Sequence, residues 1–302
     1  MAEYLTTTSE LASVADAIRT KGGTTATLSF PVGFVSAIND IETGAGGEGY
    51  TMDEIAERTA MSGSIYGSVA SFVASSAFYY CSNLTTANFP MATKIYGYAF
   101  YNCSNLTTVS FPMATSIGGY VFYYCSKLTT ANFPMATSIG DAAFAYCSNL
   151  TTANFPMATS IGLGAFSKCN SLTSVSFPSV TIIGSNAFSS CHILVNVDFP
   201  STTIIWHNAF VSCFSLTTAR FSAVTSIGNG AFQKCYRLIS LYLDGVSKVP
   251  KLGTNVFSST PIGGYTTSTG GVLGSVFVPA SLYESFITAT NWSSVSARMV
   301  SV

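Results

Sequence analysis

The eight cysteines of this chain are evenly spaced, and this spacing constrains the fold more than any other feature. Consecutive cysteines are 22 residues apart throughout, at Cys81, Cys103, Cys125, Cys147, Cys169, Cys191, Cys213 and Cys235. Zinc sites need closely spaced pairs such as C-x-x-C, and disulfide frameworks are typical of short secreted chains with uneven spacings. We therefore interpret each thiol as a small buried side chain that recurs once per structural repeat, and we predict no metal site and no cofactor.

The segments between the cysteines repeat as well. Aligned on the cysteines, the unit reads A-F-x-x-C-x-x-L-T-x-x-x-F-P-x-x-T-x-I-G-x-x. A period of roughly 20–29 residues with one strand per unit is typical of a leucine-rich-repeat solenoid. Since one unit cannot bury its apolar face alone, neighbouring units must stack and bury it jointly.

The second copy shows what each part of the unit does. Phe100, Cys103 and Leu106 are spaced three residues apart, which predicts a short 3₁₀ or α segment with one inward stripe. Val109 and Phe111 alternate with polar residues, which predicts a short strand with these two side chains pointing inward.

The same copy predicts where the strand ends and the chain returns. Pro112 has no N–H for a strand ladder and ends the strand, Gly118 permits a tight return, and Ile117 points back into the core. The predicted fold class is therefore an α/β repeat solenoid. It is a right-handed coil with one parallel sheet on the concave face and short helical or 3₁₀ segments on the convex face.

This repeat pattern resembles the BspA-like class of leucine-rich repeats, over roughly residues 71 to 252. The resemblance implies a non-enzymatic solenoid that binds proteins and mediates adhesion, as in members found on bacterial surfaces. This chain departs from those members because no export signal or cell-wall anchor is recognisable. The first residues carry Glu3, Glu10 and Asp16 and lack the basic start and apolar run of a secretory signal.

The N-terminal stretch differs from the repeats. Apolar spacing predicts one helix over residues 10–21 and a second over 33–41, within a helical module at 1–42 that precedes a Gly-rich linker at 43–50. The module resembles the start of prophage-encoded tail or appendage proteins of gut Firmicutes. The alternative is a generic helical hairpin that caps or tethers the solenoid.

The solenoid itself is predicted over residues 71–258, between two caps. Residues 51–70 form the N-terminal cap and residues 259–302 the C-terminal cap, since open ends of a solenoid must be covered. In the C-terminal cap we expect a last strand near 274–278 and a helix that starts at Pro279 and runs through Thr288.

Charge limits the possible partners. Only 8% of residues are charged, with 12 Lys and Arg against 13 Asp and Glu, so a basic face for nucleic acid is not expected. No apolar block long enough to span a membrane is present, and we expect none to be inserted. The protein is expected to be cytoplasmic at synthesis and to reach a virion or the extracellular space after lysis; a non-classical route to the cell surface is the alternative.

Catalysis is the least supported function. The chain has only two histidines, His192 and His207; both lie in the sixth unit with Asp198. In the repeat, His192 falls on the outer arc, His207 in a loop and Asp198 on the strand, so the three are not expected to converge. No nucleophile motif such as G-x-S-x-G is present, so we predict that the protein is not an enzyme.

The outward positions of the strands form the main candidate binding surface. In the first five units these positions carry only Thr, Ser and Asn, whereas the last three units introduce Asp198, Arg220 and Tyr242. Arg and Tyr often anchor protein interfaces, so we predict that a protein or cell-surface component docks here on the concave face. A structural spacer without a ligand is the alternative.

A tyrosine-rich outer arc is a second candidate surface. It contains Tyr79, Tyr80, Tyr101, Tyr123, Tyr124 and Tyr146. Carbohydrate binding and self-association are two interpretations of this arc, and simple coverage of the convex face is the third.

Overall fold

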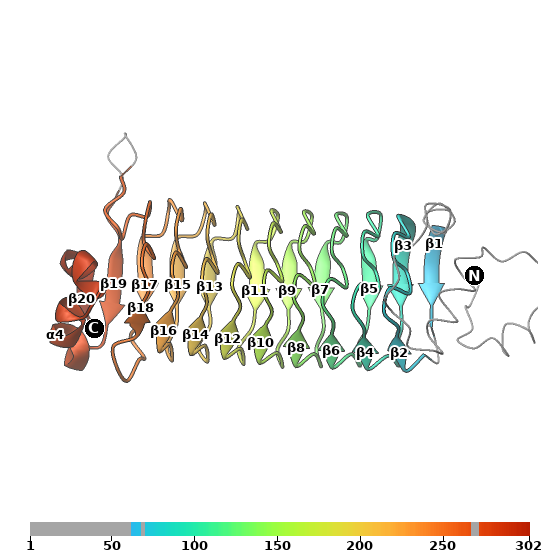
Figure 1. The fold of residues 1–302 in the computed structure, drawn as a ribbon, viewed down its shortest axis with the longest axis horizontal. Helices are drawn as coiled ribbons and strands as arrows, with labels where there is room; N and C mark the ends of the chain where they lie inside the picture. The colour runs from blue at the N-terminus through green and yellow to red at the C-terminus, as the bar shows by residue number, and fades with distance from the viewer. Residues whose placement is uncertain (1–61, 68–69, 267–271) are drawn as a thin grey trace, which may run out of the picture.

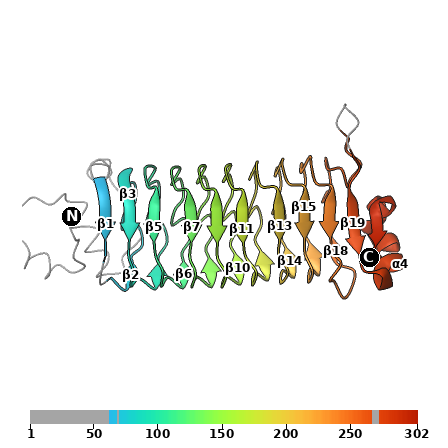
Figure 2. The same ribbon diagram turned by 180° about the vertical axis from the view of Figure 1, so that it is seen from behind.

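The structure, a computed structural model, describes residues 62–67, 70–266 and 272–302. The described chain is a stack of similar turns that runs almost straight in Figure 1, and the reverse view in Figure 2 agrees. The predicted repeat solenoid is therefore confirmed. The helices expected at 10–21 and 33–41 and the linker at 43–50 lie outside the described residues.

One strand per turn builds the predicted parallel ladder, which we call the strand face. Its strands are β1 (Ser62–Tyr66), β3 (Asn83–Asn88), β5 (Thr108–Ser110), β7 (Thr130–Asn132), β9 (Thr152–Asn154), β11 (Ser174–Ser176), β13 (Asn196–Asp198), β15 (Thr218–Arg220), β17 (Ser240–Tyr242), β19 (Ser275–Val278) and β20 (Met299–Ser301). In β5, Thr108 and Ser110 are exposed, and Phe111, which directly follows the strand, is buried, as predicted. Strand β1 pairs with β3, so the ladder extends into the segment predicted as a cap.

The ladder is interrupted twice. Sheets β1-β3-β5, β7-β9-β11 and β13-β15-β17-β19-β20 follow one another along the stack. The first two sheets end at strands whose inward residues, Val109 and Val175, are only half-buried, whereas Ala87, Ala131 and Ala153 are buried at the same position. Residue size alone does not explain the interruptions, because Val197 in β13 and Leu241 in β17 are buried at the same position.

A second parallel sheet was not predicted. Its nine strands are two residues long: β2 (Phe72–Val73), β4 (Lys94–Ile95), β6 (Ser116–Ile117), β8 (Ser138–Ile139), β10 (Ser160–Ile161), β12 (Ile182–Ile183), β14 (Ile204–Ile205), β16 (Ser226–Ile227) and β18 (Lys251–Leu252). Ile117 is buried as expected, but its segment is a strand and not only a return. Two residues are too short for an alternating pattern to be visible in the sequence.

The segments expected as helical are turns. In the second unit Tyr98, Phe100 and Asn102 donate their backbone N–H groups to the next turn of the solenoid, at Gly119, Val121 and Tyr123. A helix would use these donors within its own segment. Tyr98 and Asn102 have φ of 61° and 57°, in the left-handed region, so the chain turns twice between the strands instead of coiling into a helix.

Two columns of phenylalanine fill the core. The rings of Phe144 and Phe166, one repeat apart, stack with centroids 5.2 Å apart and planes at 1°. Phe155, from the other column, meets Phe144 edge to face at 5.7 Å. These offset and T-shaped contacts are the favoured geometries of aromatic rings, and the columns run through the described repeats.

The cysteines form a buried ladder of free thiols, as predicted. They are more than small apolar side chains, because each thiol from Cys103 to Cys235 donates a hydrogen bond to a phenylalanine carbonyl of the preceding turn. Cys147 Sγ lies 3.1 Å from the carbonyl oxygen of Phe122, and Cys169 Sγ lies 3.1 Å from that of Phe144. Burial raises the pKa of the thiols from Cys125 to Cys235, to about 12 for Cys213.

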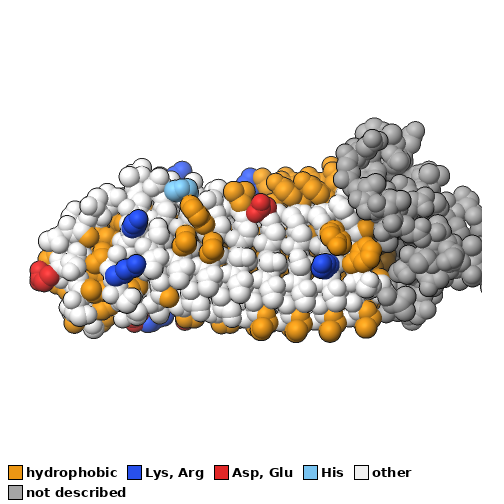
Figure 3. Space-filling model, turned by 60° about the horizontal axis from the view of Figure 1, so that its bottom comes forward, with side chains coloured by type: hydrophobic (Ala, Val, Ile, Leu, Met, Phe, Trp, Pro, Cys, Tyr) orange, Lys and Arg blue, Asp and Glu red, His pale blue; other side chains and the backbone are white. Residues whose placement is uncertain are grey.

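Hydroxyl groups and glycines hold the turns in register. Thr137 Oγ1 donates to the carbonyl of Thr115 at 3.1 Å, and Thr107 Oγ1 donates to that of Thr85 at 3.0 Å. At Gly140 a Cβ atom would lie 2.5 Å from the carbonyl carbon of Gly118, so the close approach of these turns needs glycine. Neutral hydroxyls therefore replace charged groups on the surface, and Figure 3 shows charged side chains only as isolated spots.

The C-terminal cap covers the last turn. As predicted, β19 precedes a short helix, with η1 (Ala280–Leu282) after Pro279 and α4 (Tyr283–Thr288); η2 (Trp292–Arg298) and β20 were not predicted. Trp292 is buried, and its Nε1 donates to the carbonyl of Pro250 at 2.7 Å. Among the described residues no helix is long and apolar enough to cross a membrane.

The Phe144→Ala substitution is expected to lower the free energy of unfolding by about 3–5 kcal/mol, because it leaves a cavity between stacked rings. Met157→Ala, at a side chain that is 52% exposed, is the control and should change it by less than about 0.5 kcal/mol. Urea denaturation followed by far-UV circular dichroism measures both. A loss under about 1 kcal/mol for Phe144→Ala contradicts the packing described here.

The cysteines are expected to react slowly with a chromogenic disulfide reagent in the native protein at pH 8. Burial raises their pKa, so the reactive thiolate is scarce as well as inaccessible. After unfolding in guanidinium, all eight cysteines should titrate at once. Rapid labelling of most of them without denaturant would show that the thiols are not buried in the native protein.

Candidate binding surface

Arg220, Tyr242 and Phe277 lie in line on the strand face, on β15, β17 and β19. They are successive partners in the parallel register. Arg220 Cζ lies 4.4 Å from the centroid of the Tyr242 ring, whose other neighbour, Phe277, stacks at 4.4 Å with planes at 8°. The structure therefore brings two of the three predicted site residues into direct cation–π contact.

The third predicted residue, Asp198, is not the ion-pair partner of Arg220. Asp198 is exposed at the end of β13 and pairs in register with Arg220, but Arg220 Nη1 bonds Oδ2 of Asp244 at 2.5 Å. Asp244 was missed because it lies beyond the outward strand positions. The signal was there: Asp244 stands where the first six units have proline.

This ion pair is only partly buried, and it holds the guanidinium in place. The side chains of Arg220 and Asp244 are 38% and 30% exposed. The other carboxylate oxygen, Asp244 Oδ1, is buried without a hydrogen-bond partner within the described part of the chain. Arg220 is thus fixed by a ring on one side and a carboxylate on the other, with part of its surface open to a partner.

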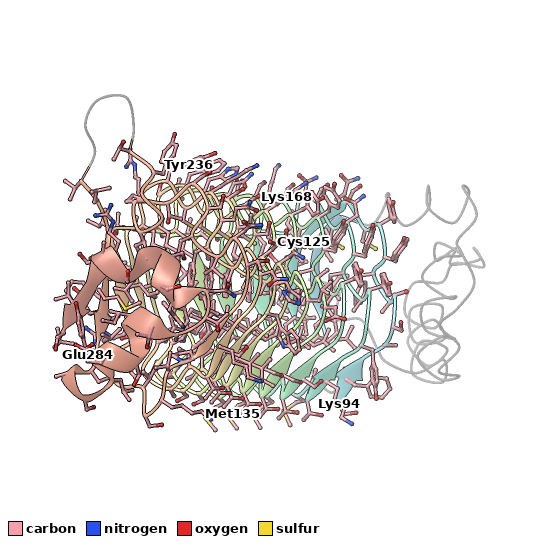
Figure 4. All side chains as sticks on the ribbon, turned by 60° about the vertical axis from the view of Figure 1, so that its left-hand side comes forward. Lys94, Cys125, Met135, Lys168, Tyr236 and Glu284 are labelled. Carbon is pink, nitrogen blue, oxygen red and sulfur yellow. The ribbon has the colours of Figure 1, made fainter. Side chains whose placement is uncertain are left out.

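The same three repeats expose a hydrophobic rim that sequence reasoning missed. We define the hydrophobic rim as Ile193, Val195, Phe214, Tyr236 and Ile239, which are all exposed, between 36% and 43%. Aromatic rings of consecutive turns meet along it: His192 stacks on Phe214 at 4.6 Å and Phe214 on Tyr236 at 5.3 Å, and Tyr236 contacts Tyr265 at 5.5 Å with a tilt of 39°. Tyr236 lies along the upper edge of the stack in Figure 4.

The repeat alignment contained the signal for this rim. At the place of Phe214 and Tyr236 the first four units have serine, and at the place of Val195 and Ile239 the first five have threonine. Val195 and Ile239 thus replace a threonine directly before β13 and β17, whereas Thr217 before β15 keeps its hydroxyl. Exposed apolar side chains gathered in neighbouring repeats mark interaction sites more often than scattered ones do.

The first repeats present a uniform surface instead. On the strand face Asn154 Nδ2 donates to Asn132 Oδ1 at 2.9 Å, so neighbouring amides satisfy one another. The strand face therefore has a self-contained half toward the N-terminus and a varied half toward the C-terminus.

The histidines take packing roles. His192 stacks on Phe214, and His207 Nδ1 accepts a hydrogen bond from the backbone N–H of Asn229 at 3.0 Å. Within the described ranges neither histidine interacts with Asp198, and no three His, Cys, Asp or Glu side chains lie together as a metal site would require.

The tyrosines predicted on the outer arc form a connected cluster, and Tyr98 and Tyr120 join it. We call these eight residues the tyrosine ladder: Tyr79, Tyr80, Tyr98, Tyr101, Tyr120, Tyr123, Tyr124 and Tyr146. Burial and the neighbouring phenols raise the pKa of Tyr101 and Tyr123 to about 12. Lys168 ends the ladder, with Nζ 2.9 Å from the Tyr146 hydroxyl and 4.5 Å from its ring centroid.

Comparison with known protein families identifies the type of repeat in this chain. The model of the BspA type leucine-rich repeat region matches residues 71–181 and 159–270, which is more than half of the chain. No curated protein matches. The match begins at residue 71, so the resemblance of residues 1–42 to prophage tail proteins has no counterpart in it.

One solved structure shares the fold, and others are similar in sequence. A leucine-rich repeat protein from Bacteroides ovatus is 24% identical, with a TM-score of 0.53 over 72% of this chain and 64% of its own. A leucine-rich cell surface protein from Faecalibacterium prausnitzii is 22% identical (TM-score 0.41, 79% and 86% covered), and a T. pallidum leucine-rich repeat protein is 24% identical (0.41, 58% and 76%). The chain thus spans less than two thirds of the B. ovatus protein.

The Arg220→Ala substitution is expected to lower the free energy of unfolding by about 1 kcal/mol or less, because the ion pair and the ring contact are both partly exposed. Urea denaturation checks this value. Asn132→Ala, on the uniform half of the strand face, is the control. A loss above about 3 kcal/mol for Arg220→Ala would show that the contacts of Arg220 with Tyr242 and Asp244 are needed for the stability of the fold.

Proposed function

The chain belongs to the BspA-type leucine-rich repeat family, and from this premise we propose that it is a non-enzymatic module that binds a protein component of a cell surface. Leucine-rich repeat proteins typically mediate protein binding or adhesion. The observation that carries the proposal is the contact of Arg220 with Tyr242 in the same repeats as the hydrophobic rim, which depart from the uniform pattern.

A spacer does not account for this departure. A spacer needs only turns that stack, and in the first five repeats the outward strand positions carry only Thr, Ser and Asn. Exposing Phe214, Ile193 and Ile239 in place of polar residues costs solvation free energy, roughly 25 cal/mol for each Å² of apolar surface left in water. A partner that covers this surface recovers that free energy.

The surface is also preorganised. Arg220 is held by Asp244 and Tyr242, and Tyr242 is held by Phe277, so these side chains lose little conformational freedom on binding. Ordering a long side chain at an interface costs about 0.5–1.5 kcal/mol, and this cost is already met in the free protein. Arg and Tyr in such positions are frequent hot spots of protein interfaces.

The setting of this binding is part of the proposal. The protein would meet its partner outside the cell, on a cell surface or on a virion released by lysis. A role as a phage appendage rests on the resemblance of residues 1–42 and is tested by the gene neighbourhood, where tail, holin and lysin genes are expected.

Binding is tested with the fluorescently labelled full chain on intact bacterial and epithelial cells, by flow cytometry. We expect saturable binding on at least one of these surfaces, weakened tenfold or more by Arg220→Ala, Tyr242→Ala and Phe214→Ser. Phe214→Ser restores the residue of the first four repeats, and Asn132→Ala is the matched control. Since the chain carries few charges, the affinity should fall only mildly between 50 mM and 300 mM salt.

The outcomes separate the alternatives. Loss of binding after protease treatment of the cells identifies a protein partner, whereas loss after periodate treatment identifies a carbohydrate. An equal loss of affinity for Asn132→Ala would show that the partner contacts the whole strand face. Absence of saturable binding on every surface tested favours the spacer.

A further inference from the structure

Tyrosines one repeat apart in the tyrosine ladder stack face to face. The ring centroids of Tyr98 and Tyr120 are 5.0 Å apart with planes at 0°, and those of Tyr124 and Tyr146 are 4.4 Å apart with planes at 19°. Tyr101 and Tyr123 stack at 5.0 Å with planes at 13°. The repeat therefore presents pairs of phenols at van der Waals distance on consecutive turns.

These pairs are aligned atom on atom, because the repeat relates them by translation. Tyr124 and Tyr146 have φ of 60° and 62°, and Tyr98 and Tyr120 have φ of 61° and 58°. With the same backbone conformation and nearly parallel rings, the carbons ortho to the two hydroxyls are separated by about as much as the ring centroids. Two phenoxyl radicals held in this way need only a side-chain rotation to form a carbon–carbon bond.

We propose that the tyrosine ladder is an oxidative cross-linking site, at which hydrogen peroxide and a haem peroxidase join Tyr124 to Tyr146 and Tyr98 to Tyr120 as dityrosine. Each phenol loses one electron and its hydroxyl proton, and the two radicals form one bond between their ortho carbons. The two ortho hydrogens then return to the oxygens. The pair loses two electrons and two protons, which reduce one peroxide to two waters.

Exposure favours these two pairs. Tyr98 and Tyr124 are each 41% exposed, so each pair offers an oxidant one accessible ring. Tyr101 and Tyr123 lie deeper between neighbouring phenols. The surface position also leaves room for the rings to twist apart, which the product requires because its rings are no longer parallel.

The cross-link would join turns that the cysteines cannot join. The thiols of neighbouring turns are buried, and they donate hydrogen bonds to phenylalanine carbonyls instead of forming disulfides. The exposed tyrosines are therefore the side chains through which a covalent bond between turns could form. Each bond would close a loop of one repeat and lower the entropy of the unfolded chain. This inference does not depend on the proposed binding function.

The test treats the full chain with horseradish peroxidase and an equimolar amount of hydrogen peroxide, followed by trypsin and mass spectrometry. Trypsin cuts after Lys94, Lys127 and Lys168, and the peptide 128–168 contains Tyr146 as its one tyrosine. We expect peptide 95–127 joined to peptide 128–168, two hydrogen atoms lighter than their sum, together with dityrosine fluorescence. A mixture of ¹⁴N and ¹⁵N chains should give this product without mixed isotopes, since the bond lies within one chain.

Two comparisons decide the result. Tyr146→Phe should abolish the joined peptide and keep the modification within 95–127, where Tyr98 and Tyr120 lie. Tyr236 and Tyr265, at 5.5 Å but tilted by 39°, are the matched reference pair, and their link should be at least fivefold less abundant. The proposal is overturned if the joined peptide is absent, is mainly intermolecular, or is no more abundant than the Tyr236–Tyr265 link.

Discussion

The structure depends on backbone hydrogen bonds that recur between consecutive turns. Phe100 donates its N–H to Val121, Thr107 to Thr85 and Gly118 to Ile95, so each turn satisfies the backbone groups of its neighbours. A buried backbone group without a partner is costly, and the repeat length is therefore fixed. Once the length is fixed, identical residues lie above one another, and the columns of phenylalanine, cysteine, threonine and tyrosine follow from this single constraint.

The same constraint confines functional variation to outward side chains and to the ends. In the last repeats the second sheet pairs Ile227 with Leu252, three residues beyond the usual interval. The extra residues follow Asp244, at the place where the regular units return after proline. A loosened turn thus supplies the carboxylate that holds Arg220, and the surface gains a fixed charge without a change in the strand ladder.

Features that recur in every repeat could be predicted from the sequence, whereas features that depend on the residues of single turns were missed. The inward residues of the second unit, such as Phe111 and Ile117, are buried as predicted. The turns were mistaken for helices because most of their left-handed positions carry residues such as Tyr98 and Asn102; in the described repeats glycine, the usual signal, stands there only at Gly164 and Gly230. Arg220 and Tyr242 were predicted on one binding surface, but Asp244 and the hydrophobic rim were not, because these residues lie outside the outward strand positions.

The two aromatic surfaces of the solenoid have different physical requirements. A tyrosine in the ladder stacks its ring on a neighbour and keeps its hydroxyl in water, so the ladder is stable without a partner and its chemistry is that of phenols. Phe214, Ile193 and Ile239 have no polar group to hydrate, and their exposure remains unfavourable until another surface covers them. The proposed binding surface therefore lies in the C-terminal repeats, whereas in the N-terminal repeats neighbouring amides pair and neighbouring phenols stack.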